Sequence, residues 1–545
     1  MQIAISLMGG LGLFLYGMNL MADGLQKSAG EKLKRIVELL TSNVLMGVLV
    51  GALVTAIIQS SSATTVMVVG FVNAGIMTLP QAIGVIMGAN IGTTITAQLV
   101  SLDLVGIAPL ALGIGIVIYL FSKNQKAKTI AEILIGFGIL FTGMDFMKEA
   151  VKPLAEFKGF TEALVAFSNQ PILGILLGFG ITAIVQSSSA SMGMLLALAS
   201  QGLIPLTAAL PILYGENIGT CVTSLISSIG ASINARRAAV MHLVFNVIGT
   251  IVFMLILTKP ITMIVQNLNP DDVSRQIANA HTLFNVINVI LLLPFSKYIV
   301  KLTMKLMPEK ESEKESEKEK NKAVHYIDER MMETPSIALS NTVKETLRMG
   351  EKAKSSLNNA MEGFLEKSKS KVDASFEEEK IINKLQKSIL NYLLKLSKTS
   401  LNDDSRESVD LLFNTVNDIE RVGDHAENIA ELASSVIEGK LSLSEGGEKE
   451  LRDLYDKVME TYNTALDCME KSDVDLACRV IKLEEQVDMM EKSCRLNHMR
   501  RLNENSCSVD SGVIFLDLIS NLERVADHSA NIAQQVIKES NKNLA

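Results

Sequence analysis

Two short polar strings interrupt apolar sequence, at residues 59–62 within "TAIIQSSSAT" and at 186–189 within "TAIVQSSSAS". Three hydroxyls and an amide supply hydrogen-bond donors and acceptors without formal charge. Runs of serine compete with the helix backbone for hydrogen bonds, so they favour helix ends over helix interiors. Irregular backbone at membrane depth is tolerated only inside the protein or beside a polar cavity. We therefore predict that each string is the tip of a broken helix or hairpin inside the protein.

The helix that follows each string is predicted to begin at the serines. A helix N-terminus carries partial positive charge and unpaired N–H donors, which together attract anions. Neither string contains lysine or arginine, so the local sequence leaves the charge of an anion uncompensated. Na⁺ would compensate it, because glutamine and serine oxygens are the hard ligands that such a cation prefers. The pattern predicts a small oxyanion site that takes a cation with it. Serines that serve only as small packing residues between helices are the alternative.

A second pair of motifs follows the strings, "GANIGTT" at 88–94 and "GENIGTC" at 215–221. Their glycines would permit an unwound turn, and their asparagines and threonines offer further oxygen ligands. Glu216 stands where the first copy has Ala89. An ionisable group in an apolar stretch is a functional candidate by default. A coupling or pairing role and a simple interfacial position both remain open for it.

The strings belong to an internal duplication. "MGVLVGALVTAIIQSSSA" at 46–63 matches "LGILLGFGITAIVQSSSA" at 173–190, and the glycine motifs match at the same offset (88 to 215). Matched polar interruptions in two halves of a membrane chain are the best sequence indication of a transporter's binding site. We place the repeats at about 1–125 and 126–305.

Composition divides the 545-residue chain, of which 48% is hydrophobic. Up to about Pro308, apolar stretches approach the roughly 20 residues that a spanning helix needs, whereas those ending at Ile58 and Val185 are short. Met1–Met21 lacks a basic start, so we expect a retained first helix rather than a cleaved signal. We predict a transmembrane domain at 1–307, a charged linker at 308–334 and a helical soluble domain at 335–545.

Charge and cysteine usage indicate where the soluble domain lies. Lys297, Lys301 and Lys305 follow the last apolar stretch, which favours a cytoplasmic exit. The five cysteines form no CxxC pair and suit reduced cytosolic thiols. The expected location is the cell (inner) membrane, as a multi-pass protein.

The soluble region carries a duplication of its own. "NDIERVGDHAENIA" at 417–430 matches "SNLERVADHSANIA" at 520–533, and apolar residues recur at helical spacing around both. Within each string a Glu and an Asp four residues apart share one helix face. Two such faces could hold a metal ion through their carboxylates. A salt-bridged surface helix that uses Arg421 and Arg524 is the alternative.

The paired QSSS strings, each followed by G-x-N-I-G-T, resemble the type II sodium–phosphate cotransporters, in the bacterial branch with a C-terminal PhoU-like domain. The resemblance implies an all-α fold, with a polytopic membrane domain of two inverted repeats with broken helices, followed by a PhoU-like pair of three-helix bundles. It places phosphate and Na⁺ between the two strings.

The implied phosphate-binding residues comprise both strings and one asparagine from each glycine motif: Gln59, Ser60, Ser61, Ser62, Gln186, Ser187, Ser188, Ser189, Asn90 and Asn217. The implied sodium ligands are Gln59, Ser62, Thr64, Thr65, Thr93, Gln186, Ser189, Ser191 and Thr220. The second copy has Met192 in place of Thr65, so that part of the site is asymmetric. The PhoU-type metal patch, for divalent or transition metal ions, comprises Glu420, Asp424, Glu523 and Asp527.

The resulting hypothesis is sodium-coupled symport of inorganic phosphate by alternating access, with the PhoU-like domain as a cytoplasmic regulator. No nucleophile–base constellation points to an enzyme, and no motif points to nucleic acid. The expected partners are phosphate, Na⁺, the bilayer, a second copy of the chain and cytoplasmic regulatory proteins. Transport of another small oxyanion, phosphate export and a non-transporting phosphate sensor are the alternatives.

Overall fold

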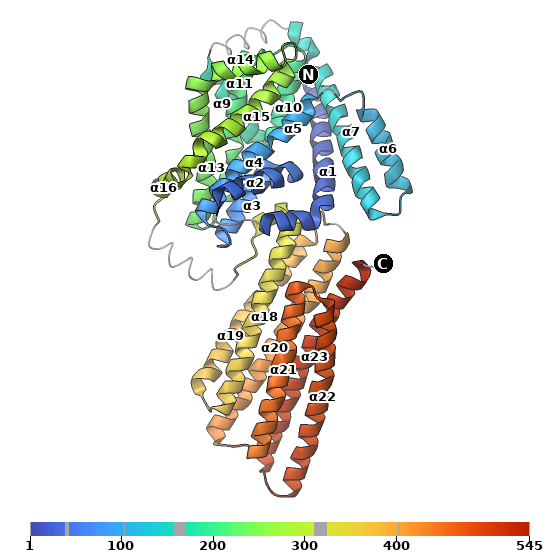
Figure 1. Cartoon of the computed structure of the whole chain (residues 1–545), viewed down its shortest axis with the longest axis vertical. Coiled ribbons are helices and arrows are strands. Elements are labelled where there is room, and N and C mark those ends of the chain that lie inside the picture. Colours follow the sequence, from blue (N-terminus) through green and yellow to red (C-terminus); the bar gives the residue numbers. More distant parts are fainter. Residues whose placement is uncertain are drawn as a thin grey trace. The chain divides into compact units, whose positions relative to one another are not determined.

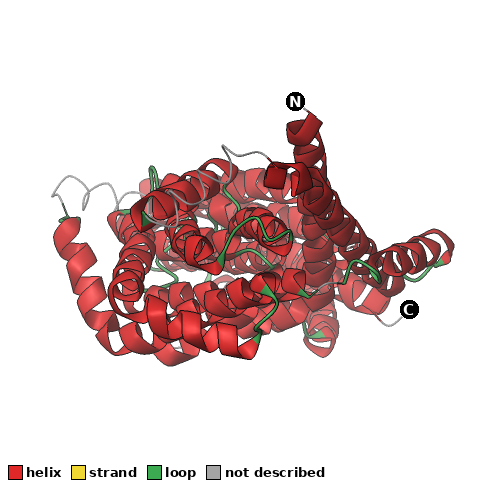
Figure 2. Cartoon of the chain, turned by 90° about the horizontal axis from the view of Figure 1, so that it is seen from above, coloured by secondary structure: helices red, strands yellow, loops and turns green. Residues whose placement is uncertain are grey.

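The computed structural model describes residues 2–38, 43–102, 104–156, 170–309, 324–401 and 403–543. These residues form helices and no strand, as the predicted all-α class requires (Figure 2). The chain divides into two compact units: one contains Met1–Glu317 and Asp328–Ile337, the other Lys318–Ile327 and Ala338–Ala545. Most of the predicted charged linker, residues 310–323, lies outside the described residues.

Among the described residues, the two sequence repeats form two sets of helices that follow the same order along the chain (Figure 1). The first set is α1 (Gln2–Glu38), α2 (Val44–Ile58), α3 (Ser61–Asn73), α4 (Leu79–Gly92), α5 (Thr94–Ser101) and α6 (Ala108–Phe121). The second set is α7 (Gln125–Val151), α9 (Pro171–Val185), α10 (Ser188–Ser200), α11 (Leu206–Gly219), α12 (Cys221–Ser227) and α13 (Ile233–Val252). The π-helical turn η2 (Phe253–Leu257) and the helices α14 (Thr258–Leu268), α15 (Val273–Leu292) and α16 (Ser296–Leu306) follow the second set.

The equivalent helices α1 and α7 pack against each other in opposite directions. A Cβ added at Gly10 would lie 2.8 Å from the Met147 nitrogen, and one at Gly17 would lie 2.3 Å from the Leu140 nitrogen. Residue numbers that increase along α1 thus lie next to residue numbers that decrease along α7, so the two helices are antiparallel. Gly136 and Gly143 of α7 make the reciprocal contacts with α1, so small residues let the two backbones touch.

Glycine also brings α4 against α2, and α11 against α9. A Cβ at Gly88 would lie 2.0 Å from the Val48 carbonyl oxygen, and one at its counterpart Gly215 would lie 2.1 Å from that of Ile175. Both glycines lie inside regular helices, so the expected unwound turn is not found at these positions. The glycines are required because the helices pack too closely for any side chain there.

Five helical stretches of the described residues are long and apolar enough to cross a membrane. They are Gln2–Ala29, Leu79–Ser101, Gln125–Leu154, Ile233–Leu268 and Val273–Leu306. The helices on either side of each QSSS string are shorter. On α6, Leu110, Val117, Leu120 and Phe121 are all more than half exposed, which suits contact with lipid rather than water. The chain is thus a multi-pass membrane protein.

Residues 328–333, expected to be linker, form a short helical segment packed on the first unit. Asp328 precedes the 3₁₀ turn η4 (Glu329–Glu333) and accepts a 2.6 Å hydrogen bond from Asn73 at the end of α3. Arg330 pairs with Asp328 at 2.9 Å and donates to the Ser227 carbonyl at 2.6 Å. The segment thereby joins α3 of the first repeat to the end of α12 in the second.

The second unit is built from two successive sets of three long helices. The first set is α18 (Pro335–Leu365), α19 (Lys369–Leu396) and α20 (Asp403–Gly439), and the second is α21 (Glu445–Lys471), α22 (Val474–Asn503) and α23 (Val509–Asn543). The buried face of α20 includes Val409, Leu412, Val416, Ile419 and Gly423, which have the three- and four-residue spacing expected of a bundle helix. Helices α20 and α23, which carry the duplicated E-R-x-x-D-H strings, contact each other.

Candidate transport site

Both QSSS strings break a helix, as predicted. Gln59 ends α2 and Gln186 ends α9, each in the left-handed region with φ of 58° and 55°. The next residue, Ser60 or Ser187, is extended and caps the following helix. Non-glycine residues with positive φ are uncommon, and their presence at both equivalent positions marks a defined, constrained turn.

The capping serines leave their protons available. Ser60 Oγ accepts from the Ala63 nitrogen at 3.1 Å, and Ser187 Oγ accepts from the Ala190 nitrogen at 3.2 Å. A hydroxyl that accepts in this way can still donate its own proton. Each tip thus combines a helix N-terminus with hydroxyl donors. Both features bind anions, and neither carries a formal charge.

The tip of the first repeat is closed by hydrogen bonds. Gln59 is only 7% exposed, and its Oε1 accepts from Thr96 Oγ1 of α5 at 2.9 Å. Ser61 donates to Thr93 at 3.4 Å, so the string and the first glycine motif lie together. Thr64 and Thr65 are buried, and their hydroxyls donate to the carbonyls of Ser60 and Ser62.

The tip of the second repeat is open. Gln186 is exposed, whereas its counterpart Gln59 is buried. Thr223 is the counterpart of Thr96, and its buried hydroxyl has no hydrogen-bond partner in the part of the chain that the structure describes. Thr220, the counterpart of Thr93, donates instead to the Glu216 carbonyl of its own helix at 3.0 Å. Identical strings therefore occupy different environments in the two repeats.

The remaining predicted ligands lie close to these tips but bond within their own repeat. The amides of Asn90 and Asn217 each donate at 2.9 Å to a carbonyl four residues earlier. Ser191 donates to Glu216 at 2.7 Å. The repeats meet through helices, because α3 packs on α12 and α13 while α10 packs on α5 and α1. Each helix that begins at a QSSS string therefore contacts the other repeat.

In the second unit, the predicted metal patch separates into two carboxylate groups. Glu420 and Asp424 of α20 lie beside Glu379 of α19, whose side chain is 2% exposed. Burial, followed by the charges of Asp424, Glu427 and Glu420, raises the pKa of Glu379 to about 8. A bound cation would remove the repulsion among these groups.

The other group lies between α22 and α23. Glu484, Asp488 and Asp527 each place a carboxylate oxygen within 4.8 Å of the others. Burial and the neighbouring acids raise the pKa of Asp527 and of Glu523. The donor set, oxygen only, fits a hard divalent cation. Sequence reasoning missed Glu379, Glu484 and Asp488, although the E-x-x-x-D spacing of the last two was available as a signal.

A pair of histidines lies between helices α20 and α23. His425 hydrogen-bonds Asn521 at 2.9 Å, and His528 makes the equivalent 2.9 Å bond to Asp418. The two imidazole rings stack with centroids 5.6 Å apart. The duplicated helices α20 and α23 thus meet through reciprocal contacts, with one carboxylate group on each.

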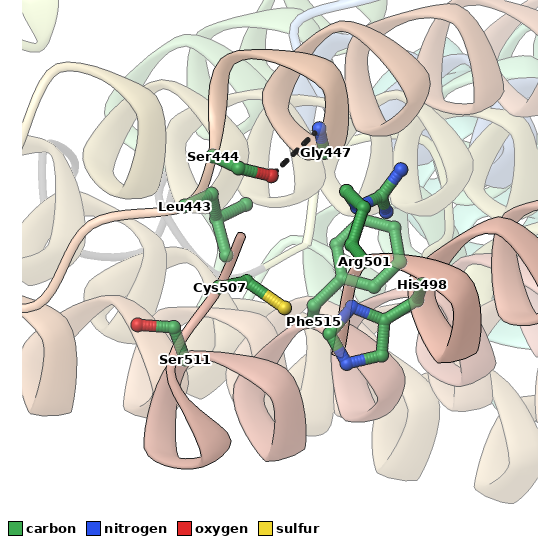
Figure 3. A pocket seen from close by; sticks show the side chains of 8 residues that line it. All are labelled: Leu443, Ser444, Gly447, His498, Arg501, Cys507, Ser511 and Phe515. Atoms are coloured by element: carbon green, nitrogen blue, oxygen red, sulfur yellow. Dashed lines mark hydrogen bonds between the residues drawn. The ribbon is translucent and has the colours of Figure 1, made fainter. Parts of the chain in front are cut away.

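A small pocket between α21, α22 and α23 does not offer a substrate site (Figure 3). The Arg501 guanidinium lies 5.4 Å from the centre of the Phe515 ring, and Ser444 accepts from the Gly447 nitrogen at 3.3 Å. The free space holds about one water molecule.

Comparison with known proteins agrees with this division into two units. The model of the family described as Na⁺/Pi-cotransporter matches twice, at residues 13–149 and 143–268. The PhoU domain model also matches twice, at 346–433 and 451–536. Both duplications seen in the sequence are thus recovered.

Individual relatives cover different shares of the chain. YjbB of Salmonella typhimurium, named an inorganic phosphate export protein, is 24% identical over 99% of this chain and 98% of its own. The uncharacterised protein YqeW of Bacillus subtilis is 33% identical over 57% of this chain and 100% of its own. The human sodium-dependent phosphate transport protein 2B is 38% identical over 19% of this chain and 15% of its own.

Among solved structures, PhoU from Pseudomonas aeruginosa covers 37% of this chain and 97% of its own, with 23% identity and a TM-score of 0.36. The first Na⁺/Pi-cotransporter match extends from α1 through most of α7 and the second from the end of α7 through α14, so each contains one QSSS tip, and the PhoU matches lie within the two three-helix sets of the second unit. The chain therefore belongs to the Na⁺/Pi-cotransporter family and carries a C-terminal PhoU domain.

Proposed function

We propose that this protein carries inorganic phosphate across the cell membrane together with Na⁺, by alternating access. The observation that supports this most is the difference between the two tips. Gln59 is buried and bonded to Thr96, whereas Gln186 is exposed and Thr223 is unpartnered. Two equivalent gates, one closed and one open, are what a carrier caught in one end state would show.

Alternating access in such folds requires repeats of opposite orientation. The antiparallel packing of α1 on α7, which are equivalent helices, supports an inverted arrangement. If both helices span the bilayer, the repeats that follow them enter it from opposite sides. In the opposite state of the carrier, the second tip would then have the closed, hydrogen-bonded arrangement of the first tip, and the first tip would be open.

The chemistry of the tips supports an oxyanion with a cation. Serine hydroxyls and helix N-termini at Ser60–Ser62 and Ser187–Ser189 donate hydrogen bonds to phosphate oxygens. Side-chain oxygens of Gln59, Gln186, Thr93 and Thr220 remain as ligands for Na⁺. Uncharged donors alone do not compensate the negative charge of phosphate. A co-transported cation therefore lowers the free-energy cost of burying the phosphate inside the protein.

The PhoU-like unit is proposed to lie in the cytoplasm and to regulate transport. Lys297, Lys301 and Lys305 lie on α16, close to the point where the chain leaves the membrane unit, and such a cluster favours the cytoplasmic side. The carboxylate groups around Glu379 and Asp527 would bind divalent or transition metal ions, which would tie together helices of each three-helix set.

The direction of physiological flux is a separate question. Relatives that match the chain over nearly its whole length are named for phosphate export. A Na⁺-coupled carrier runs in either direction according to its gradients, so export is the second candidate within the same mechanism.

The test is flux of ³²P-phosphate by the full-length protein in liposomes. An inward Na⁺ gradient should drive accumulation, a K⁺ gradient should not, and an outward Na⁺ gradient should drive efflux. Unlabelled phosphate should compete, whereas sulfate and dicarboxylates should not. Phosphate binding without Na⁺-driven flux would contradict transport and favour a sensor.

A further inference from the structure

At one buried position beside the tips, only the second repeat carries an ionisable side chain. Ala89 of the first repeat is replaced in the second by Glu216, which is 2% exposed and lies inside α11. The surrounding residues are otherwise equivalent: Thr55 and Thr64 in the first repeat correspond to Thr182 and Ser191 in the second (an offset of 127 in each case).

In the first repeat these groups satisfy one another. Thr55 donates to Thr64 at 2.9 Å, and Thr64 donates to the Ser60 carbonyl at 3.1 Å. Both threonines are fully buried. Ala89 has no polar side-chain atom, so no hydrogen-bonding group in this part of the first repeat requires a ligand.

In the second repeat the Glu216 carboxylate changes which hydrogen bonds form, and two buried side-chain oxygens have no partner. Ser191 donates to Glu216 Oε1 at 2.7 Å. Glu216 Oε2 and Thr182 Oγ1 are both buried, and neither has a hydrogen-bond partner among the described residues. They are therefore not bonded to each other. Buried polar atoms are rarely left without a partner, and each exception calls for an explanation.

Helix packing brings the turn of α11 that carries Glu216 against the turn of α9 that carries Thr182. A Cβ at Gly219 would lie 2.8 Å from Thr182 Cβ, and Gly219 follows Glu216 by one helical turn on α11. Thr182 is also one turn before the exposed tip, since its carbonyl accepts from the Gln186 nitrogen at 2.7 Å. The location is thus buried but adjacent to the open end of the second repeat.

We propose that Glu216 and Thr182 form a Na⁺ site that exists in the second repeat only. Glu216 Oε2 and Thr182 Oγ1 are the ligand atoms, and Ser191 is a positioning residue that holds the carboxylate through Oε1. Oxygen ligands with a single negative charge suit a monovalent hard cation. The choice of Na⁺ as the cation rests on the proposed function.

The site would couple the cation to the tip. Its residues come from α9, α10 and α11, the three helices that meet around Gln186. A cation held by α9 and α11 fixes the base of the open tip before the anion arrives. The first repeat needs no such ion, because hydrogen bonds already fix its tip.

The experiment is equilibrium binding of ²²Na⁺ to the purified full-length protein at constant ionic strength, with choline as the replacing cation. We expect Glu216→Gln, which keeps the acceptor for Ser191 but removes the charge, to bind one Na⁺ fewer per chain than the wild type. Thr182→Val should weaken the same site, and it carries the test if Glu216→Gln does not fold. Glu132→Gln, which removes a membrane-unit glutamate paired with Lys27, should leave the count unchanged.

An unchanged number and affinity of bound Na⁺ in both Glu216→Gln and Thr182→Val would overturn the site. So would a wild-type protein that binds no Na⁺. Because phosphate flux is not measured, a protein that binds Na⁺ through Glu216 but moves no phosphate would leave the site standing and overturn only the proposed function.

Discussion

Thr96→Val should open the closed tip of the first repeat. The substitution preserves side-chain shape and removes the hydroxyl that donates to Gln59 Oε1 at 2.9 Å. Leaving a buried acceptor without its donor costs about 1–3 kcal/mol. Each 1.4 kcal/mol changes an equilibrium constant tenfold. The open form of this tip should therefore gain population by a factor of about 5 to 150.

The assay is the rate of thiol labelling by a membrane-impermeant reagent at single cysteines in a chain whose native cysteines are replaced. Ser61→Cys and Ser188→Cys report the two tips at equivalent positions. The buried Ser61 position should label slowly and the partly exposed Ser188 position quickly. Adding Thr96→Val should speed labelling at position 61 by a factor of about 5 to 150.

Thr223→Val is the matched control, because Thr223 is the counterpart of Thr96 and its hydroxyl has no partner in this state. It should leave labelling at position 188 nearly unchanged. Equal labelling at both serine positions, or no response at position 61 to Thr96→Val, would refute the assignment of closed and open tips.

Three further outcomes are expected from thermal unfolding of the full chain in detergent. Gly17→Val should lower the midpoint sharply, since even a Cβ there would lie 2.3 Å from the Leu140 nitrogen, whereas Gly12→Ala, with open space around it, should not. Because the folded-state pKa of Glu379 is raised from 4.5 to about 8, the folded chain holds a proton that the unfolded chain loses, so stability should fall as pH rises between those values. Glu379→Gln should flatten that dependence, and a wild-type slope in this variant would contradict it. Arg330→Ala should cost about 1–3 kcal/mol through the lost bonds to Ser227 and Asp328, and Lys123→Ala, at an exposed loop, serves as control.

Sequence predicted the features that local chemistry determines. Serine favours helix ends over helix interiors, so the breaks at Ser60 and Ser187 could be predicted from three serines in a row within apolar sequence. The same holds for the helical PhoU-like unit, whose apolar spacing defines the buried faces. The glycines of these motifs were predicted only in part, because composition cannot distinguish a glycine that ends a helix from one that lets two helices touch. Gly92 and Gly219 are the last residues of α4 and α11, so each motif does contain a helix break. Gly88 and Gly215 belong to the second kind.

Features that depend on tertiary contacts were beyond the sequence. The strings around Gln59 and Gln186 are nearly identical, so their different burial reflects the state of the fold and not the local residues. The carboxylate groups gather acids from separate helices, which is why Glu379 escaped notice although Glu420 and Asp424 did not. The sequence did single out Glu216, and the fold supplied its neighbours Thr182 and Ser191.

The central claim is that the two QSSS tips bind the phosphate that is transported. Its most direct test compares Na⁺-driven ³²P-phosphate flux in liposomes for Ser61→Ala, Ser188→Ala and Ser200→Ala, the last being an exposed serine at the far end of α10. We predict that the first two variants lose most of the flux while remaining folded, and that Ser200→Ala transports normally. Normal flux in both Ser61→Ala and Ser188→Ala would contradict the account.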